Sequence, residues 1–443
     1  MKSRIALALP LCAGICLAQG LFQPSKVASV HLAFTPDQWR ALEPARSGNG
    51  SVNFGSGEWL QGRAGKRNGL ASAMGIEFKN VHAGITIDGR TLNDVAVRYK
   101  GNGTYLDAQE SRKFSFKVDL NKYVKGQSFA EVTTINLHNN ITDPSWMNEP
   151  LAYRLYRDAK VPAPRTSYTR VYLSVTGKYD KRYAGLYSIV ENVDQHFIAH
   201  HFVNKGGALF KPVSTSLFNY LGPDWSKYNQ TYDPKGAVTV EQKQRLIDFT
   251  RLVTEANDIE FAARLPQFVD LEELARYMAV MVFLSDVDGI LGSGQNFYLY
   301  LDPKSQKFSF LPWDQDHSFG QFPFTGSQEQ RNELSIHHPW VGRKRFLERV
   351  FAVDAFKKLY LARLEEFSRT IFDPQRFAAQ VDEIAALIRP AVQEEGKLDR
   401  FDRAVAGTSR SIVPIKPFVK LRAKSVADQL AGRSRGARID GRN

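Results

Sequence analysis

The stretch from residue 286 to residue 320 constrains the fold more than any other part of the chain. Two short aromatic and aliphatic runs, residues 297–300 and 308–311, are separated by a polar turn that begins at Asp302. Runs of this length around an Asp-Pro turn are typical of a β-hairpin. Because hairpin strands are antiparallel, we expect the residues before the first strand and after the second to lie close together.

Polar side chains stand at both of these predicted strand ends. Asp286, Asp288 and Asn296 precede the first strand, and Asp314 and Asp316 follow the second. Converging oxygen ligands of this kind are typical of a site for a divalent cation. For any one of these carboxylates, an exposed loop is the better explanation. Gly, Asn, Pro and Trp crowd the same two turns, however, and this favours a site for the set as a whole.

The first residues indicate export. Lys2 and Arg4 precede an apolar run, residues 5–17, that has the length of a signal peptide and is too short to span a bilayer. We therefore predict a signal peptide over residues 1–19 and a secreted or periplasmic product. No later stretch is long and apolar enough to predict stable membrane insertion.

Cysteine usage and charge narrow the class of protein. The only two cysteines, Cys12 and Cys16, lie in the predicted signal peptide, so the mature chain is expected to have no disulfide. Lys and Arg number 59 against 46 Asp and Glu, an excess of 13 that permits an anionic partner. A soluble protein with a high pI explains this excess better than nucleic-acid binding, so no nucleic-acid partner is predicted.

Strand patterns dominate the N-terminal half and helical patterns the C-terminal half. A capping box at residues 270–273 opens an apolar helix that leads directly to Asp286. The predicted fold class is α+β, with a cleft between the two halves as the expected place for a site. Residues 46–73 are rich in Gly, Ser and Arg and are predicted to form a mobile loop, and residues 431–443 a flexible basic tail.

A glycine-containing segment lies between two predicted strands in the first half. Gly101 and Gly103 break the alternation, and a loop of this kind can hold phosphates with its backbone N–H groups. Basic residues flank it, and a predicted helix at residues 143–159 carries a glutamate, Glu149. The order lysine, helix glutamate, Asp, Asn, Asp along the chain is the order of a protein-kinase site.

Several further motifs make the chain resemble the spore coat protein H (CotH) kinase family of atypical secreted protein kinases. They are residues 97–104 (Val-Arg-Tyr-Lys-Gly-Asn-Gly-Thr), 112–117 (Arg-Lys-Phe-Ser-Phe-Lys), 137–140 (Leu-His-Asn-Asn) with Asp143, 148–152 (Asn-Glu-Pro-Leu-Ala), 185–194 (Gly-Leu-Tyr-Ser-Ile-Val-Glu-Asn-Val-Asp), 295–300 (Gln-Asn-Phe-Tyr-Leu-Tyr), 312–314 (Pro-Trp-Asp), Asp316 and 318–320 (Ser-Phe-Gly). The blocks around the hairpin are specific when taken together. The resemblance spans residues 27–430.

The resemblance implies a two-lobed protein-kinase-like fold over residues 20–430. Its N-lobe would cover about 24–193 and its C-lobe about 194–430. It also implies transfer of the γ-phosphoryl group of ATP, with Mg²⁺ or Mn²⁺, to Ser or Thr of a protein outside the cytoplasm. Neither the protein substrate nor the source of ATP follows from the sequence.

The resemblance also implies roles for particular residues. Asp288 would be the catalytic Asp, with Asp286 as the alternative. Lys113 would bind phosphate and pair with Glu149, with Lys100 and Lys117 as alternative lysines. The metal ligands would be Asn296, Asp314 and Asp316, and the remaining nucleotide contacts would come from Gly101, Gly103, Lys100, Lys117, Glu191 and Trp313.

Two other functions fit part of the pattern. A non-catalytic secreted scaffold or surface-assembly protein could keep the fold without the reaction. A secreted metal-dependent hydrolase would explain the Asp cluster but not Lys113, Glu149 or the glycine segment. The lysine, the Asn and the metal-binding Asp favour catalysis over a scaffold.

Overall fold

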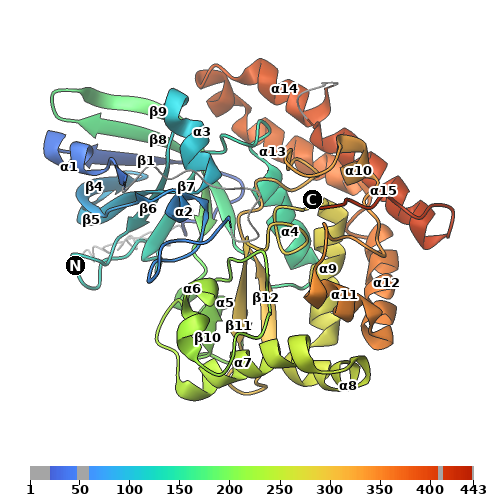
Figure 1. The fold of residues 1–443 in the computed structure, drawn as a ribbon. Helices are drawn as coiled ribbons and strands as arrows, with labels where there is room; N and C mark the ends of the chain where they lie inside the picture. The colour runs from blue at the N-terminus through green and yellow to red at the C-terminus, as the bar shows by residue number, and fades with distance from the viewer. Residues whose placement is uncertain (1–19, 47–58, 408–412, 442–443) are drawn as a thin grey trace, which may run out of the picture.

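The computed structural model describes residues 20–46, 59–407 and 413–441. The predicted signal peptide lies outside the described residues. Among the described helices, none has both the length and the apolar character needed to cross a membrane. The described chain is mixed α+β, with a barrel built by the first half and a helical part built by the second (Figure 1).

Within the described residues, seven strands close into a barrel in the order β1-β4-β5-β6-β7-β9-β8. Six neighbouring pairs are antiparallel, and β1 closes the barrel against β8 in parallel. The strands are β1 (Val27–Phe34), β4 (Val81–Ile87), β5 (Arg90–Lys100), β6 (Ser115–Asp119), β7 (Thr134–His138), β8 (Thr166–Val175) and β9 (Tyr179–Glu191).

Alternation along the strands separates the barrel core from its outer face. Val97 and Tyr99 of β5 and Leu137 of β7 are buried in the apolar core of the barrel. Because successive side chains point to opposite faces, Lys100 and His138 lie on the outside. The register pairs Arg98 with Lys117, so β5 and β6 present cations side by side on that outer face.

Short elements decorate the barrel. These are α1 (Pro36–Ala41), β2 (Ala45–Arg46), α2 (Leu70–Ala73), β3 (Ile76–Glu77) and α3 (Gly103–Ser111). The described part of the predicted 46–73 loop therefore contains a helical turn. The segment between β5 and β6 is not a simple glycine loop either, since it folds into the nine-residue helix α3.

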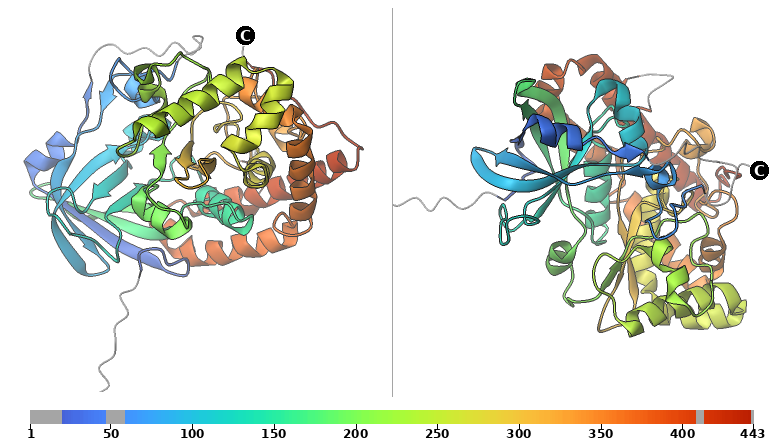
Figure 2. Two further views of the ribbon diagram at one scale, coloured as in Figure 1. Left: turned by 90° about the horizontal axis from the view of Figure 1, so that it is seen from below. Right: turned by 60° about the vertical axis from the view of Figure 1, so that its left-hand side comes forward.

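The helical part has its own apolar core, which also takes in α4 (Asn148–Asp158) from the first half of the chain. Figure 2 shows the helical part beside the barrel in both views. Its helices are α5 (Gln195–His201), α6 (Asn229–Tyr232), α7 (Val240–Glu255), α8 (Asp258–Phe268), α9 (Leu271–Leu284), α10 (Gln328–Asn332), α11 (Arg345–Ala352), α12 (Asp354–Ser368), α13 (Pro374–Glu394), α14 (Leu398–Ala406) and α15 (Ile415–Leu430), with a 3₁₀ turn at Trp225–Lys227.

The predicted hairpin is confirmed as β11 (Phe297–Leu301) and β12 (Phe308–Pro312). A third strand, β10 (Ala208–Phe210), pairs with β11 on its other edge. Both hairpin strands are buried along their whole length. This explains why their sequences read as continuous apolar runs rather than as alternating patterns.

The predicted flexible tail is wrong for its described part. Ala437 and Ile439 form parallel bridges to Leu334 and Val341, and Ile439 is buried in the core. The Gly-rich, Arg-rich composition suggested fraying. The bridging partners lie about a hundred residues earlier, so no local pattern could reveal them.

Candidate active site

The hairpin brings its two flanking turns together, as the sequence predicts. Phe297 pairs with Pro312, and the Trp313 backbone N–H donates to the Asn296 carbonyl at 3.1 Å. The Asn296 amide in turn donates to Asp288 Oδ2 at 2.9 Å. Asp288, Asn296 and the residues after β12 therefore form one polar cluster at the open end of the hairpin.

Asp286 and Asp288 differ in how firmly they are held. Asp286 accepts from the Gln315 side chain at 3.0 Å and from the Asp288 backbone N–H at 3.2 Å, and it is 1% exposed. Asp288 is 8% exposed, and its second carboxylate oxygen has only a long contact, 3.4 Å, to the Gln295 amide. Burial raises the pKa of Asp286 to about 6 and that of Asp288 to about 7. Asp288 thus has the more available carboxylate and the pKa closer to neutrality.

Asp314 and Asp316 approach the same cluster from the end of β12. The Asp314 N–H donates to the Tyr153 hydroxyl at 3.0 Å, and that hydroxyl donates to Glu149 at 3.2 Å. Asp316 accepts from the Thr142 hydroxyl at 2.6 Å. The helix α4 thus holds the backbone of Asp314, and the loop before α4 holds the carboxylate of Asp316.

The two carboxylates titrate in opposite directions. Burial by itself raises the pKa of Asp314, but Lys100, His138 and Lys211 outweigh burial and lower it. Burial raises the pKa of Asp316 to about 6. Asp314 is therefore the carboxylate of this pair that neighbouring cations keep ionised.

The predicted pairing of Lys113 with Glu149 is wrong. Lys113 lies before the start of β6, where its ammonium binds both carboxylate oxygens of Glu395 at 2.7 and 2.9 Å. Lys100, at the end of β5, is the lysine near Glu149. Its ammonium contacts His138 Nε2, and the other ring nitrogen of His138 lies 2.5 Å from Glu149 Oε2. A histidine therefore bridges the lysine and the helix glutamate.

His138 also belongs to a possible metal-binding group. One ligand atom from each of His138, Glu149 and Asp314 lies within 4.8 Å of the others. His138 lies within one of the motifs that carry the family resemblance, which implies no role for it. Its place on the outer face of β7, next to Lys100 on β5, depends on strand register rather than on spacing in the sequence.

Two lysine ammonium groups lie near the Trp313 ring. Lys100 Nζ lies 5.2 Å and Lys211 Nζ lies 5.4 Å from the centre of a Trp313 ring. Burial lowers the pKa of Lys211 to about 7, with Asp314 acting in the opposite direction. Lys211 follows β10 directly, and the sequence interpretation gave it no role.

Lys117 lies near Lys100, and together with Lys211 these lysines are called the basic surface below. Its ammonium donates to Asn192 at 3.1 Å, and burial together with Arg98 and Lys100 lowers its pKa to about 8. Buried cations that depress one another's pKa in this way form a site with a strong preference for anions. Lys100 and Lys211 lie near the Trp313 ring and also act on the Asp314 carboxylate, so cations and a carboxylate meet beside Trp313.

Three other residues were predicted to contact the nucleotide: Gly101, Gly103 and Glu191. Gly101 has a φ of +103°, and an added Cβ would come within 2.2 Å of Thr104 Oγ1, so the turn into α3 requires glycine. Gly103 begins α3 and has open space around its Cα. The Glu191 carboxylate binds Arg165 Nε at 3.0 Å and His201 at 3.2 Å. The side chain of Glu191 is therefore used to fix the end of β9.

His317 is a further residue that the sequence interpretation missed. Burial lowers its pKa, but Asp316, Asp288, Asp286 and Asp314 outweigh burial and raise it. Its Nδ1 is buried and has no hydrogen-bond partner among the described residues. An imidazolium among four carboxylates offsets part of their mutual repulsion.

The three predicted metal ligands carry oxygen donors. Asn296, Asp314 and Asp316 offer amide and carboxylate oxygens, the donors that Mg²⁺ and Mn²⁺ prefer, and of these three only Asp314 also belongs to the group with His138 and Glu149. The raised pKa values of Asp288 and Asp316 show that their negative charge is incompletely balanced by the protein. A bound cation would supply that balance.

The chain is similar to several known proteins. The model of the family described as "CotH kinase protein" matches residues 97–426. "Inner spore coat protein H" of Bacillus subtilis (strain 168) is 23% identical over 319 residues, covering 70% of this chain and 82% of that protein. A solved complex of HipA, HipB and operator DNA from Shewanella oneidensis MR-1 aligns with a TM-score of 0.34 and 11% identity, over 72% of this chain and 63% of that one. The family match spans most of the chain and confirms the resemblance found in the sequence, and the chain belongs to the CotH kinase protein family.

Proposed function

We propose that this chain is a protein kinase that transfers the γ-phosphoryl group of ATP to a serine or threonine of a protein outside the cytoplasm. The observation that carries this proposal is the meeting of two opposite surfaces at Trp313. Lys100, Lys117 and Lys211 form the basic surface, and Asp288, Asp314 and Asp316 form the acidic one. Phosphoryl transfer needs cations at the phosphates and carboxylates for the metal and the acceptor.

Lys100 takes the place of the phosphate-binding lysine in this proposal. The His138 bridge to Glu149 fixes its side chain, in the way that a direct lysine–glutamate pair does in ordinary kinases. Lys117 and Lys211 would contact further phosphate oxygens. The separate apolar cores of the barrel and of the helical part support a two-lobed architecture with the nucleotide between them.

Asp314, Asn296 and Asp316 would hold Mg²⁺ or Mn²⁺. A bound ion of this kind neutralises charge on the phosphoryl group as it moves. Asp314 suits this role because neighbouring cations keep it ionised. The Thr142 hydroxyl donates to the Asp316 carboxylate and would orient it toward the same ion.

Asp288 would accept the proton of the acceptor hydroxyl. A pKa of about 7 makes its carboxylate a competent base near neutral pH. In the transfer, the hydroxyl oxygen bonds to the γ-phosphorus, the bond from that phosphorus to the β-phosphate oxygen breaks, and the proton passes to Asp288. Asn296 holds one Asp288 oxygen and thereby orients the other.

The proposed class of protein substrate rests only on the similarity to Inner spore coat protein H. That relative is an inner spore coat protein by its name, which favours a structural surface protein as the substrate. Export of this chain rests on the predicted signal peptide. Mass spectrometry of the secreted product should find an N-terminus near residue 20, and an intact Met1 in the cytoplasm would contradict export.

The test is transfer from labelled ATP. Purified mature protein is incubated with γ-labelled ATP, Mg²⁺ or Mn²⁺ and an extract of secreted proteins. We expect labelled phosphoserine or phosphothreonine with the native chain and none with Asp314→Ala, while circular dichroism shows both folded. Full transfer by Asp314→Ala would contradict the assigned role. Absence of transfer under all conditions would favour the scaffold alternative.

A further inference from the structure

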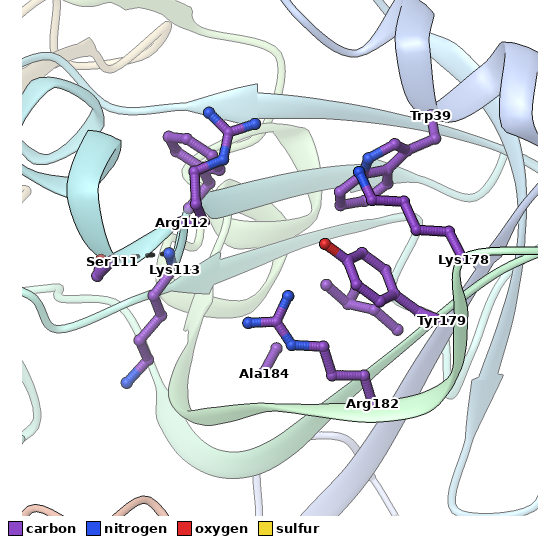
Figure 3. Close-up of a pocket in the computed structure, with 10 residues that line it drawn as sticks. Trp39, Ser111, Arg112, Lys113, Lys178, Tyr179, Arg182 and Ala184 are labelled. Atoms are coloured by element: carbon purple, nitrogen blue, oxygen red, sulfur yellow. Dashed lines mark hydrogen bonds between the residues drawn. The ribbon is translucent and has the colours of Figure 1, made fainter.

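A pocket opens on the barrel, beside α1, the turn between α3 and β6, and the β8–β9 hairpin (Figure 3). Its lining shares no residue with the acidic cluster around Asp288. Figure 1 shows α1 and the tip of the β8–β9 hairpin on the side of the barrel away from β11 and β12. The lining residues are Trp39, Ser111, Arg112, Lys113, Phe114, Leu173, Lys178, Tyr179, Arg182 and Ala184.

The lining is basic and carries no carboxylate. Its four cations are Arg112, Lys113, Lys178 and Arg182. Arg112 pairs with Glu43, and the ammonium of Lys113 turns out of the pocket to bind Glu395 at 2.7 Å. Among the described residues, no carboxylate pairs with Lys178 or Arg182. Two exposed cations therefore stand at one hollow without a counter-charge.

Aromatic rings hold these two cations in place. Lys178 Nζ lies 5.2 Å from the Tyr179 ring centre and 6.0 Å from that of Trp39. Arg182 Cζ lies 4.9 Å from the same Tyr179 ring. Trp39 and Tyr179 meet edge to face at 5.9 Å. Cation–π contacts of this kind restrict long side chains that would otherwise move freely in water.

The pocket also offers hydroxyl donors. The Tyr179 hydroxyl points into the space between the guanidinium groups of Arg112 and Arg182 (Figure 3). Ser111 lies at the rim beside Arg112. Guanidinium forks combined with hydroxyl donors match the oxygen geometry of a phosphate group.

We propose that this pocket binds the phosphate of a phosphorylated serine or threonine carried on a protein segment. Recognition of a phosphorylated peptide by clustered arginines is a known mode of binding. The cations here surround one hollow, whereas nucleic-acid binding uses a basic track that follows many phosphates. The pocket lies apart from the acidic cluster, so this inference does not depend on the proposed kinase activity.

The test measures binding of three probes to the full-length mature chain by fluorescence anisotropy. The probes are a fluorescein-labelled Gly-Ser peptide with one phosphoserine, the same peptide without phosphate, and a labelled oligothymidine. We expect the phosphopeptide to bind, the unmodified peptide not to bind, and millimolar inorganic phosphate to displace the phosphopeptide. If inorganic phosphate binds as tightly as the phosphopeptide, the pocket binds free phosphate rather than a phosphorylated protein segment, and the proposal is overturned.

Arg182→Ala and Lys178→Ala should each weaken phosphopeptide binding about tenfold, the effect of losing one charge-assisted contact. Lys181→Ala is the matched control, because Lys181 is an exposed cation of the same hairpin that lies outside the pocket lining. It should leave the affinity within about twofold. All three side chains are exposed, and thermal melting should show each variant folded.

Three further results would overturn the proposal. One is equal affinity for the phosphorylated and unmodified peptides. Another is an equal loss in Lys181→Ala and Arg182→Ala, which would mean unspecific attraction by net charge. The third is tight oligothymidine binding that Arg182→Ala abolishes, which would identify a nucleic-acid surface instead.

Discussion

Asn296 donates its side-chain amide to the Asp288 carboxylate at 2.9 Å, although eight residues separate them in the chain. The same amide also reaches the Asp288 carbonyl at 3.2 Å. The turn between α9 and β11 is thus closed on itself, and the closing residue is also a proposed metal ligand. The proposed base and the proposed metal ligand therefore cannot move independently. Asp286 and Asp288 both lie in this turn, and substitutions can compare them directly.

Asp288→Asn should reduce phosphoryl transfer by about 10²–10⁴-fold, the usual contribution of a positioned general base. The amide keeps the size of the side chain and removes its basicity, so ATP binding should change little. Asp286→Asn should cost much less, because Asp286 is fixed by Gln315 and is 1% exposed. Single-turnover rates of both variants provide the measurement, and the reverse ranking would move the base to Asp286.

Lys100→Met should abolish most of the transfer activity, because it removes the cation that His138 and Glu149 orient. We expect a fall in kcat/KM of about 10²–10³-fold. The matched variant is Lys113→Met, which should keep its turnover. If Lys113→Met instead loses transfer while Lys100→Met retains it, the phosphate-binding lysine is Lys113.

Lys113→Met should instead destabilise the fold. The Lys113–Glu395 pair is largely buried, with side chains 11% and 13% exposed, so removing one partner leaves an uncompensated carboxylate. The expected loss is about 3 kcal/mol in the free energy of unfolding, measured by urea denaturation. Lys113→Met with Glu395→Gln should recover part of this loss, and a double variant no better than the single one would argue against the pair.

Nucleotide binding should require a divalent cation. Asp288 and Asp316 have raised pKa values, and Mg²⁺ or Mn²⁺ would screen their repulsion of the ATP phosphates. Calorimetry should show ATP affinity falling at least about tenfold after chelation, a difference of about 1.4 kcal/mol. The same titration with Asp314→Ala should no longer respond to the metal. Equal affinity with and without metal in the native chain would contradict the proposed site.

Glu191 should make stability depend on acid pH. Burial raises its pKa, but the hydrogen bonds from His201 and Arg165 outweigh burial and lower the pKa to about 2, from an ordinary value of 4.5. By linkage, the ionised Glu191 carboxylate contributes about 3 kcal/mol to the free energy of unfolding. This contribution is fully present above about pH 5 and is lost as the pH falls toward 2.

Urea denaturation of Glu191→Gln can test this. The variant should be less stable than the native chain at pH 7, and the gap should close between pH 5 and pH 2. Glu394→Gln is the control, because Glu394 is 43% exposed in its pair with Arg170 and should show little change. A gap for Glu191→Gln that stays constant with pH would contradict the assigned cause.

Sequence patterns predict the structure best where it depends on residues that lie close together in the chain. The Asp302 turn and the two apolar runs predicted the hairpin, and antiparallel pairing then placed Asn296 beside Trp313. The α+β class likewise followed from strand and helix periodicity. These features depend on neighbours within about twenty residues.

The missed parts depend on long-range pairing. The resemblance implies Lys113 as the phosphate-binding lysine, but the Lys113 ammonium is paired with Glu395, which directly follows α13 and lies far away in the sequence. Lys211 and His317 become site residues only when β10 joins the hairpin and four carboxylates converge. No pattern in one sequence encodes such contacts between distant segments.

The parallel bridges of Ala437 and Ile439 bear on how the chain folds during synthesis. Ser335 donates to Ala437 and Val341 donates to Leu291, so residues 334–342 connect the last described segment to the turn that holds Asp288. Residues 334–342 therefore lack these bridging partners until residue 439 has left the ribosome. A fusion that interrupts residues 433–441 would remove the bridges and would weaken, through Val341 and Leu291, one support of the turn that holds Asp288.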